Sequence, residues 1–408
     1  MGRPTPLILH TECSDGWGGQ EIRIMEELRG MRRYGYATAL IAPQHSRIFS
    51  RAQAEGFEVH AVRFRNKAHL PSWVKLFQLI AQLKPDVLNT HSSDDSWMAG
   101  FAARMLGVPL IVRTRHVSTP IGSAFSYRFF PHLILTTSQA IREGLIASGI
   151  AQERIVAVPT GIDSNRFRFS SSWRKEIREK HGYSEEDILV GNICVLRSWK
   201  GLDFFIDTAA QMPVRFKFIL VGDGPQRQRL QDKAKSMGLE GRVVFPGHRE
   251  EIEKYFSALD LYFFTSYANE GVPQSLLQAR SVGLPMVVCR TPSVLETLKD
   301  AEEAIPVDYG DVASACAGLT AAIGMIRAPE ERRKEKNGQI QSRHSLEAML
   351  GEIKELYGQW GIGGPALPEA SHGMSHEEHG EPGELIGEGT VERSGHYGND
   401  ESAQRRNP

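Results

Sequence analysis

The sequence predicts an α/β protein with two similar domains in series, each a doubly wound parallel sheet covered by helices. A chain of 408 residues with 41% hydrophobic residues can bury more than one core, which favours two domains. Short apolar runs alternate with amphipathic stretches, as expected for parallel strands joined by helical crossovers. The alternation stops at a polar connection, residues 164–176, and then starts again.

The first domain is predicted to span residues 1–165. Its strands are expected at the apolar runs PLILH, ATALIA, EVHAV, DVLNT, PLIVR and HLILTT, and a helix is expected from about Gly19 to Tyr34. Each run is short enough for a strand, and the stretches between the runs are long enough for a helix. We therefore expect a Rossmann-like domain.

The second domain is predicted to span residues 166–344. Its strands are expected at ILVGNICVL, FKFILVGDG, RVVFPG, LDLYFFT and PMVVC, with a helix in GPQRQRLQDKAKSMG. A last helix is expected at 345–360, because its apolar residues recur at helical spacing. In residues 361–408 Gly, Glu, Ser and His dominate and acidic residues outnumber basic ones, which predicts a disordered acidic tail.

Composition excludes several classes of protein. The 48 basic and 49 acidic residues nearly cancel, so no electrostatic footprint for nucleic acid is present and no nucleic-acid partner is expected. The four cysteines form no CxxC pair, which argues against a disulfide framework or a zinc site and favours a reducing, cytoplasmic location. No run of about 18 apolar residues occurs, so we expect a soluble or peripheral protein.

Two glycine-containing turns follow predicted strands and precede helices. Gly18 and Gly19 open the first helix, where small residues and free amides suit a phosphate group; a simple turn is the alternative. Gly222 and Asp223 follow the strand FKFILV. There the alternative is structural: Asp223 could cap the next helix, whose first turn Pro225 would suit.

Arg197 and Lys200 lie three residues apart after the strand GNICVL. Two cations at this spacing can converge on a diphosphate, Arg197 with a planar fork and Lys200 as a point charge. Two solvated charges in a loop are the alternative. Because the carboxyl ends of parallel strands form the ligand-binding edge of such a sheet, the position favours a phosphate contact.

The segment EGVPQSLLQA, residues 270–279, is the most specific feature. Glu270 precedes a helix start, so its carboxylate can meet sugar hydroxyls, while the amides of Gly271 and Val272, next to Pro273, could face phosphate. Gln278 lies about two turns further on the same side of the helix. The alternative makes Glu270 only a favourable charge at a helix N-terminus.

His116 follows the strand PLIVR in the first domain and could bond a sugar hydroxyl; a surface histidine is the alternative. The order GGQE, RSWKG, LVGDGP, VVFPGH and EGVPQSLLQA resembles the retaining glycosyltransferases of family 4, which have the GT-B fold. The resemblance extends over roughly residues 6–360, and it implies that the helix at 345–360 is a closing helix that returns to the N-terminal domain. It implies transfer of a sugar from a nucleoside-diphosphate sugar to an acceptor hydroxyl with retention of anomeric configuration.

The resemblance also assigns roles to the candidate residues. Arg197 and Lys200 would neutralise the donor diphosphate, with Gly18 and Gly19 beside it, and Glu270 would bind the transferred sugar. No divalent metal and no cofactor are expected, in keeping with the absence of an Asp-x-Asp motif from the sequence. The chain departs from the family at Gln278, where the family has a second glutamate that binds the ribose; a glutamine lacks the second acceptor oxygen.

The acceptor is expected to be a glycan or glycolipid, in lipopolysaccharide or another cell-surface glycan. In the first domain basic residues outnumber acidic ones, and residues 63–84 combine cations, Trp73 and Phe77 with an apolar helix face. That segment could touch an anionic membrane, or be an ordinary amphipathic helix. Two other functions stay open: a non-catalytic binding member of the fold, supported only by Gln278, and a nucleotide-sugar epimerase or hydrolase.

Overall fold

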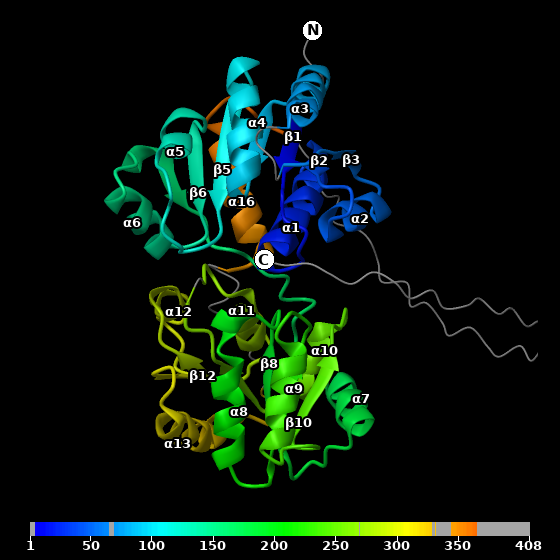
Figure 1. Cartoon of the computed structure of the whole chain (residues 1–408), viewed down its shortest axis with the longest axis vertical. Coiled ribbons are helices and arrows are strands. Elements are labelled where there is room, and N and C mark those ends of the chain that lie inside the picture. Colours follow the sequence, from blue (N-terminus) through cyan, green and yellow to red (C-terminus); the bar gives the residue numbers. More distant parts are fainter. Residues whose placement is uncertain (1–4, 65–68, 269, 329–330, 332–343, 365–408) are drawn as a thin grey trace, which may run out of the picture. The chain divides into compact units, whose positions relative to one another are not determined.

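The computed structural model describes residues 5–64, 69–268, 270–328, 331 and 344–364. They form two parallel sheets of seven and six strands, each with helices on both faces (Figure 1), which confirms the predicted α/β class. Except for its first four residues, the acidic tail predicted for 361–408 lies outside the described residues.

The first sheet has the strand order β3-β2-β1-β4-β5-β6-β7. Its strands are β1 (Leu7–Thr11), β2 (Ala37–Ala42), β3 (Glu58–Ala61), β4 (Val87–Thr90), β5 (Leu110–Arg115), β6 (Leu133–Thr136) and β7 (Ile155–Ala157). The connecting helices are α1 (Gly19–Arg33), α2 (Arg47–Ala54), α3 (Leu70–Leu83), α4 (Ser93–Met105), α5 (Phe125–Phe129), α6 (Gln139–Ala147) and η1 (Gln152–Arg154).

The second sheet has the order β10-β9-β8-β11-β12-β13. Its strands are β8 (Ile188–Ile193), β9 (Phe216–Val221), β10 (Val243–Gly247), β11 (Leu261–Phe264), β12 (Met286–Cys289) and β13 (Ala304–Val307). The helices that follow the first sheet are α7 (Ser171–His181), η2 (Ser198–Lys200), α8 (Leu202–Gln211), α9 (Arg227–Ser236), α10 (Ile252–Ala258), α11 (Gln274–Ser281), α12 (Pro292–Thr297), α13 (Val312–Ala322), η3 (Ile323–Met325) and α16 (Leu346–Gly358).

Each sheet has one strand more than the apolar runs indicated. The additional strands, β7 and β13, both lie at an edge. They have three and four residues and are only partly buried. A short strand that buries little side-chain surface leaves no apolar run long enough to recognise, which is why the sequence pattern missed both.

Alternate residues of the central strands face two separate cores. Val190 and Phe218 belong to the core on one face of the second sheet, whereas Leu189 and Ile219 belong to the core on the other. Since side chains alternate along a strand, a sheet buried on both faces needs near-continuous apolar strands. The unbroken apolar runs in the sequence reflect this double coverage.

The last described helix, α16, packs on the first sheet although it follows the second sheet in the chain (Figure 1). Leu350 is buried in the same core as Ile8 and Val112. It lies against Gly30 of α1 so closely that a Cβ at position 30 would be 2.2 Å from its Cδ1 atom. Glycine at this position lets the two helices approach.

None of the helices that the structure describes has the length and apolar character that a membrane span requires.

Truncating Leu350 should therefore destabilise the protein and make room for a larger residue than glycine at position 30. We expect Leu350→Ala to lower the free energy of unfolding by about 2–5 kcal/mol, the usual cost of such a buried cavity. Adding Gly30→Ala should recover part of this loss, because the new methyl enters the vacated space. Urea denaturation of the two single variants and the double variant measures the coupling. Leu356→Ala, at a partly buried position on the same helix, is the control; an equal loss there would contradict the packing described.

Candidate active site

The candidate residues follow strands at the carboxyl edges of the two sheets. Gly18 and His116 come after β1 and β5 of the first sheet, while Arg197, Asp223 and Glu270 come after β8, β9 and β11 of the second. In the second sheet these strands are neighbours, and in the first sheet only β4 lies between β1 and β5. Parallel strands place their carboxyl ends side by side, so residues far apart in sequence are collected at one edge.

Lys200 and Glu270 form an ion pair at the edge of the second sheet. The Lys200 Nζ atom lies 2.5 Å from Glu270 Oε1, and the same oxygen accepts a hydrogen bond from the Ser266 hydroxyl. Glu270 is 8% exposed, so its charge depends on these partners rather than on water. The pair joins a cation suited to phosphate and a carboxylate suited to hydroxyl groups in one place.

The end of β11 holds the turn that carries Lys200. The Thr265 hydroxyl donates to the Lys200 carbonyl at 2.7 Å, and the Ser266 Oγ atom lies 3.1 Å from the Trp199 carbonyl oxygen. The turn ends at Gly201, with φ of 64°, where a Cβ would be 2.1 Å from the Thr265 carbonyl oxygen. This close backbone contact requires glycine. It fixes Lys200 above the strand that leads to Glu270.

Arg197 lies at the start of the same turn and is exposed. Its guanidinium stacks 5.2 Å from the Trp199 ring, and one of its nitrogens is 3.7 Å from where a Cβ at Gly16 would be. The glycine turn before α1 therefore lies next to a cation of the second sheet. Gly19 makes a further contact there, since its carbonyl accepts a hydrogen bond from the Gln274 amide at 3.0 Å.

Gly222 and Asp223 form a tight turn rather than a helix cap. Gly222 has φ of 139°, and a Cβ there would lie 1.8 Å from the Cys194 carbonyl oxygen. The alternative role predicted that Asp223 caps α9. That prediction is wrong, because the helix begins at Arg227 and has Gln226 at its N-cap. The Asp223 carboxylate instead accepts a hydrogen bond from the amide of Gly224. The turn passes directly over the end of β8.

Residues 271–273 lead into α11, which begins at Gln274 with Pro273 at the N-cap. A Cβ at Gly271 would lie 2.0 Å from the His116 carbonyl oxygen, so glycine permits the segment to reach His116. Val272 is half-buried, and Gln278 is buried further along α11. The residue after Glu270 thereby lies against the backbone of His116, each from its own sheet.

A buried carboxylate supports the glycine turn of the first domain. Glu12 follows β1, is fully buried, and accepts hydrogen bonds from the amides of Cys13 and Ser14 at 2.8 and 2.7 Å. Burial, reinforced by the nearby Asp95 carboxylate, raises the pKa of Glu12 to about 8. Burial also raises the pKa of Asp95, to about 6. The turn thus rests on a buried carboxyl group that holds its proton more tightly than an ordinary glutamate does.

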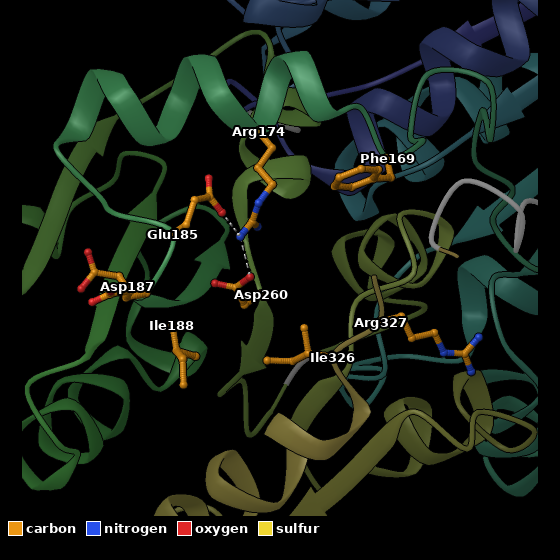
Figure 2. A pocket seen from close by; sticks show the side chains of 9 residues that line it. Phe169, Arg174, Glu185, Asp187, Ile188, Asp260, Ile326 and Arg327 are labelled. Atoms are coloured by element: carbon orange, nitrogen blue, oxygen red, sulfur yellow. Dashed lines mark hydrogen bonds and ion pairs between the residues drawn. The ribbon is translucent and has the colours of Figure 1, made fainter. Parts of the chain in front are cut away.

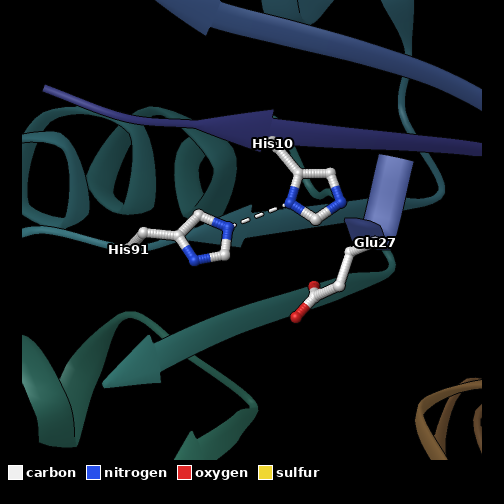
Figure 3. Close-up of side chains that lie close together, drawn as sticks. All are labelled: His10, Glu27 and His91. Carbon is white, nitrogen blue, oxygen red and sulfur yellow. Dashed lines mark hydrogen bonds between the residues drawn. The ribbon is translucent and has the colours of Figure 1, made fainter. Parts of the chain in front are cut away.

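His116 is the end of a row of buried histidines. Its Nε2 atom lies 2.9 Å from Nδ1 of His91, whose Nε2 atom lies 2.9 Å from Nδ1 of His10. Figure 3 shows the second of these contacts with Glu27 beside it. A ring nitrogen of His10, one of His91 and a carboxylate oxygen of Glu27 lie within 4.8 Å of one another. The sequence singled out only His116 of this row.

A pocket lies at the opposite edge of the second sheet, and its charged residues form ion pairs with one another. It includes Arg174, Glu185 and Asp260 (Figure 2) and lies where β8 and β11 begin. Arg174 contacts Asp260 at 3.0 Å and Glu185 at 3.4 Å. The Arg178 side chain, buried beside it, also binds Asp260. These ion pairs attach α7 to the sheet and lie at the edge away from Lys200 and Glu270.

Sequence reasoning missed four residues of the assembled region: His10, Glu12, His91 and Ser266. Glu12 and His91 directly follow the strands β1 and β4, Ser266 is the second residue after β11, and His10 lies within β1. A polar side chain immediately after an apolar strand was the available signal. It applies to most strand ends of a parallel sheet, so the signal identifies the edge but not the residues that act there.

The raised pKa of Glu12 predicts that stability falls as pH increases. A folded-state pKa of about 8 against an ordinary 4.5 means that the native state binds the proton more tightly, so the free energy of unfolding is lost between these values. The lowered histidine pKa values and that of Asp95 act mainly below pH 6.5. Between pH 6.5 and 8 we expect a fall of up to about 1.4 kcal/mol per pH unit.

Glu12→Gln should remove most of this fall, because an amide does not titrate. Urea denaturation at pH 6.5, 7.2 and 8 measures it, with Glu240→Gln, an exposed carboxylate, as the matched control. An unchanged slope in Glu12→Gln would show that Glu12 is already ionised in the folded protein.

Comparison with known families accounts for both domains. Residues 17–166 match Glycosyltransferase Family 4, and residues 174–339 match Glycosyl transferases group 1. An Escherichia coli galactosyltransferase that acts from UDP-Gal on GlcNAc-diphosphoundecaprenol is 23% identical over 313 residues, 71% of this chain and 79% of its own. LpsE of Rhizobium meliloti, a lipopolysaccharide core biosynthesis glycosyltransferase, is 29% identical over 134 residues, 33% of this chain and 38% of its own.

EpsF of Bacillus subtilis is 26% identical over 218 residues, so this chain spans little more than half, 56%, of that relative. Among solved structures, HepE of Anabaena in complex with UDP has a TM-score of 0.76 at 20% identity and covers 87% of this chain and 100% of its own. WaaG, a glycosyltransferase involved in lipopolysaccharide biosynthesis, has a TM-score of 0.64 at 15% identity over 85% and 99%. The fold and both family matches agree: the chain belongs to glycosyltransferase family 4 and has the GT-B fold.

Proposed function

We propose that this glycosyltransferase moves a sugar from a nucleoside-diphosphate sugar to an acceptor hydroxyl with retention of anomeric configuration. The observation that carries the proposal is the Lys200–Glu270 pair at the carboxyl edge of the second sheet. It combines a group that binds phosphate with one that binds sugar hydroxyls at one place on the sheet edge. Relatives whose structures hold UDP and UDP-glucose support a nucleotide-sugar donor.

In this proposal the leaving diphosphate is stabilised by side chains and backbone amides without a divalent metal. Arg197 and Lys200 supply positive charge, and Gly271 and Val272, which precede α11, supply backbone amides. Positive charge placed in advance where negative charge develops lowers the barrier of a transfer reaction. Glu270 and His116 hold the sugar, each from one domain, so that the acceptor hydroxyl meets it in one orientation.

Lys200 has two partners in turn under this scheme. Without donor, its ammonium group neutralises the buried Glu270 carboxylate. When a diphosphate binds, the ammonium turns to the phosphate oxygens and Glu270 becomes available to the sugar hydroxyls. The exchange leaves each charged group with a hydrogen-bonding partner at every stage, which avoids the cost of an isolated buried charge.

The acceptor that we propose is a glycan or glycolipid of the cell surface, in lipopolysaccharide or a similar polymer. Relatives described as lipopolysaccharide and O-antigen glycosyltransferases support this class. We place the reaction on the cytoplasmic side, where nucleotide sugars are made available to such enzymes.

An exposed apolar surface on the first domain supports contact with a membrane. Trp73 and Phe77 are half-buried and pack onto the core, and more exposed apolar residues lie near them in the chain and on other helices. Ring contacts run from Trp73 through Phe101 to Phe130 and Phe125. Several large apolar side chains of α3, α4 and α5 are exposed: Leu70, Val74, Phe101, Met105, Phe125 and Phe129. Exposed basic residues accompany them: Lys75, Arg104 and Arg128.

Replacing both Phe125 and Phe129 by Ser should weaken binding to vesicles that contain an anionic lipid. These rings are 46% and 56% exposed, so the double variant should fold while losing apolar contact area. Sedimentation with vesicles at several salt concentrations measures binding, and Val214→Ser, an exposed apolar residue of the second domain, is the control. Equal binding by wild type and double variant would remove this surface from the account.

A non-catalytic binding member of the fold is the second candidate, favoured by Gln278 in place of the family's second glutamate. The intact Lys200–Glu270 pair counts against it. Turnover separates the two: a binding member takes up donor without releasing nucleoside diphosphate in the presence of any acceptor.

Two substitutions should divide phosphate binding from sugar binding. Lys200→Ala removes a charged hydrogen bond of about 1.5–3 kcal/mol, so affinity for a nucleoside diphosphate should fall by roughly 10- to 100-fold. Glu270→Gln frees Lys200 and leaves the phosphate contact, so the free diphosphate should bind at least as tightly while the gain from the attached sugar is lost.

Calorimetric titration with UDP, GDP and ADP and their sugar conjugates measures both effects. Lys233→Ala is the matched control, because Lys233 pairs with Asp207 at 2.7 Å in the same domain. Equal affinity of wild type and Lys200→Ala would contradict the phosphate role.

Gln278 predicts a weak grip on the ribose that a carboxylate should strengthen. A charged hydrogen bond exceeds a neutral one by about 1 kcal/mol, so Gln278→Glu should raise affinity for the preferred nucleoside diphosphate about 5-fold. The 2′,3′-dideoxy analogue, which lacks both hydroxyls, should gain nothing. Titration of both nucleotides against both proteins is the measurement; an equal gain for the analogue would show that residue 278 does not contact the ribose.

A further inference from the structure

Three histidines form a continuous hydrogen-bonded row in the first domain. His10, His91 and His116 are 0%, 5% and 9% exposed, and both ring-to-ring contacts are 2.9 Å between nitrogens. The first two rings are stacked, with centroids 5.2 Å apart and planes at 9°. Both nitrogens of His91 are used, one towards each neighbour. His116 uses Nε2, which leaves Nδ1 as its other ring nitrogen.

The register of the sheet creates this row. β1, β4 and β5 are adjacent, and His10 lies opposite Asn89 while Asn89 lies opposite Val112. His91 is two residues beyond Asn89, and His116 is four beyond Val112. Because every second residue of a strand points to the same face, the three rings share a face and advance by one side-chain step per strand. The row runs from His10, inside β1, to His116, which follows β5 at the carboxyl edge of the sheet.

Hydrogen-bond counting allows only two arrangements of protons in the row. Burial lowers the pKa of all three histidines, so the rings are neutral. A neutral imidazole has one N–H group and one acceptor nitrogen. If one ring in the row is turned into the other tautomer, the other two must follow. The proton therefore lies either on Nε2 of all three rings or on Nδ1 of all three.

The inner end of the row distinguishes the two arrangements. His10 Nε2 is buried and has no hydrogen-bond partner among the described residues. The carboxylate of Glu27, which Arg23 holds at 2.8 Å, lies beside this ring. A negative charge attracts an N–H group, and Nδ1 of His10 is engaged with His91, so Nε2 is the nitrogen of this ring that can present an N–H group to the charge of Glu27. The other two rings then carry their protons on Nε2 as well.

We propose that His10 and His91 are positioning residues that hold His116 in the Nε2–H tautomer, with its Nδ1 atom as a hydrogen-bond acceptor. His116 then accepts a hydrogen bond from a hydroxyl group of the sugar and is unsuited to a ligand atom without a hydrogen. The role of His116 towards a sugar rests on the proposed function. Its tautomer does not, because the row is complete without ligand.

A metal ion is the competing use of His10, Glu27 and His91. Binding a metal would break one of the two hydrogen bonds of His91, since both of its nitrogens are occupied. It would also place a cation beside Arg23, whose guanidinium already neutralises Glu27. The observed contacts therefore favour the hydrogen-bonded row.

Nitrogen NMR of the full chain labelled with ¹⁵N-histidine tests the proposal, without donor or acceptor. The signals of His116 are identified by their loss in His116→Gln. We expect its Nδ1 to have the chemical shift of an unprotonated nitrogen and its Nε2 that of an N–H. In His10→Phe, His91 loses the acceptor of its Nε2–H, so we expect the proton to move to Nδ1 in both His91 and His116.

His60→Phe, a histidine that pairs with Glu58 outside the row, is the control and should leave His116 unchanged. A protonated Nδ1 in wild-type His116 would overturn the proposal, even if His10→Phe fails to fold. So would a His116 tautomer that does not respond in folded His10→Phe. One zinc ion per chain retained after dialysis, and lost in His10→Phe, would overturn it in favour of a metal site. Failure of donor binding in titration would remove the sugar role of His116 but leave the tautomer result in place.

Discussion

The parallel alignment of the strands is the constraint on which the rest of the structure depends. It puts the carboxyl ends of β8, β9 and β11 side by side in the second sheet and those of β1, β4 and β5 side by side in the first. Polar residues that follow these strands are collected at one edge without any long-range sequence signal. The ion pair of Lys200 with Glu270 and the row of histidines are both products of this geometry.

The two edges use buried charge in different ways. In the second domain the Glu270 carboxylate pairs with the Lys200 ammonium group and accepts a hydrogen bond from the Ser266 hydroxyl. In the first domain Glu12 lies among acidic neighbours, and burial raises its pKa to about 8. A carboxyl group with a raised pKa supports the glycine turn, whereas one paired with a lysine lies at the proposed sugar site. Environment, rather than residue type, separates the two roles.

Much of this arrangement could be predicted from the sequence. Apolar runs located eleven of the strands, and the motif order identified a family that the matches of both domains confirm. The edge strands β7 and β13 were missed because partial burial leaves no apolar pattern. The capping role considered for Asp223 was wrong, because α9 starts at Arg227 rather than at Pro225. The roles of Glu270, Lys200, His116 and Gln278 stay predictions until ligands are measured.

The histidine row could not be predicted for a different reason. His10, His91 and His116 are separated by 81 and 25 positions, and only the strand order and register bring their rings together. Sequence spacing carries no information about a diagonal contact across three parallel strands. The same holds for Gly271, whose close contact with the His116 carbonyl depends on two domains at once.

Product analysis in the presence of a metal chelator tests the central claim most directly. The purified chain would be supplied with the nucleoside-diphosphate sugar that it binds and with a lipid-linked or core-oligosaccharide acceptor, and the anomeric configuration of the new linkage would be read by proton NMR. The account predicts that nucleoside diphosphate is released in the presence of the chelator. It also predicts that the new linkage has the same anomeric configuration as the donor. An inverted linkage, or transfer that occurs only when a divalent metal is restored, would contradict it.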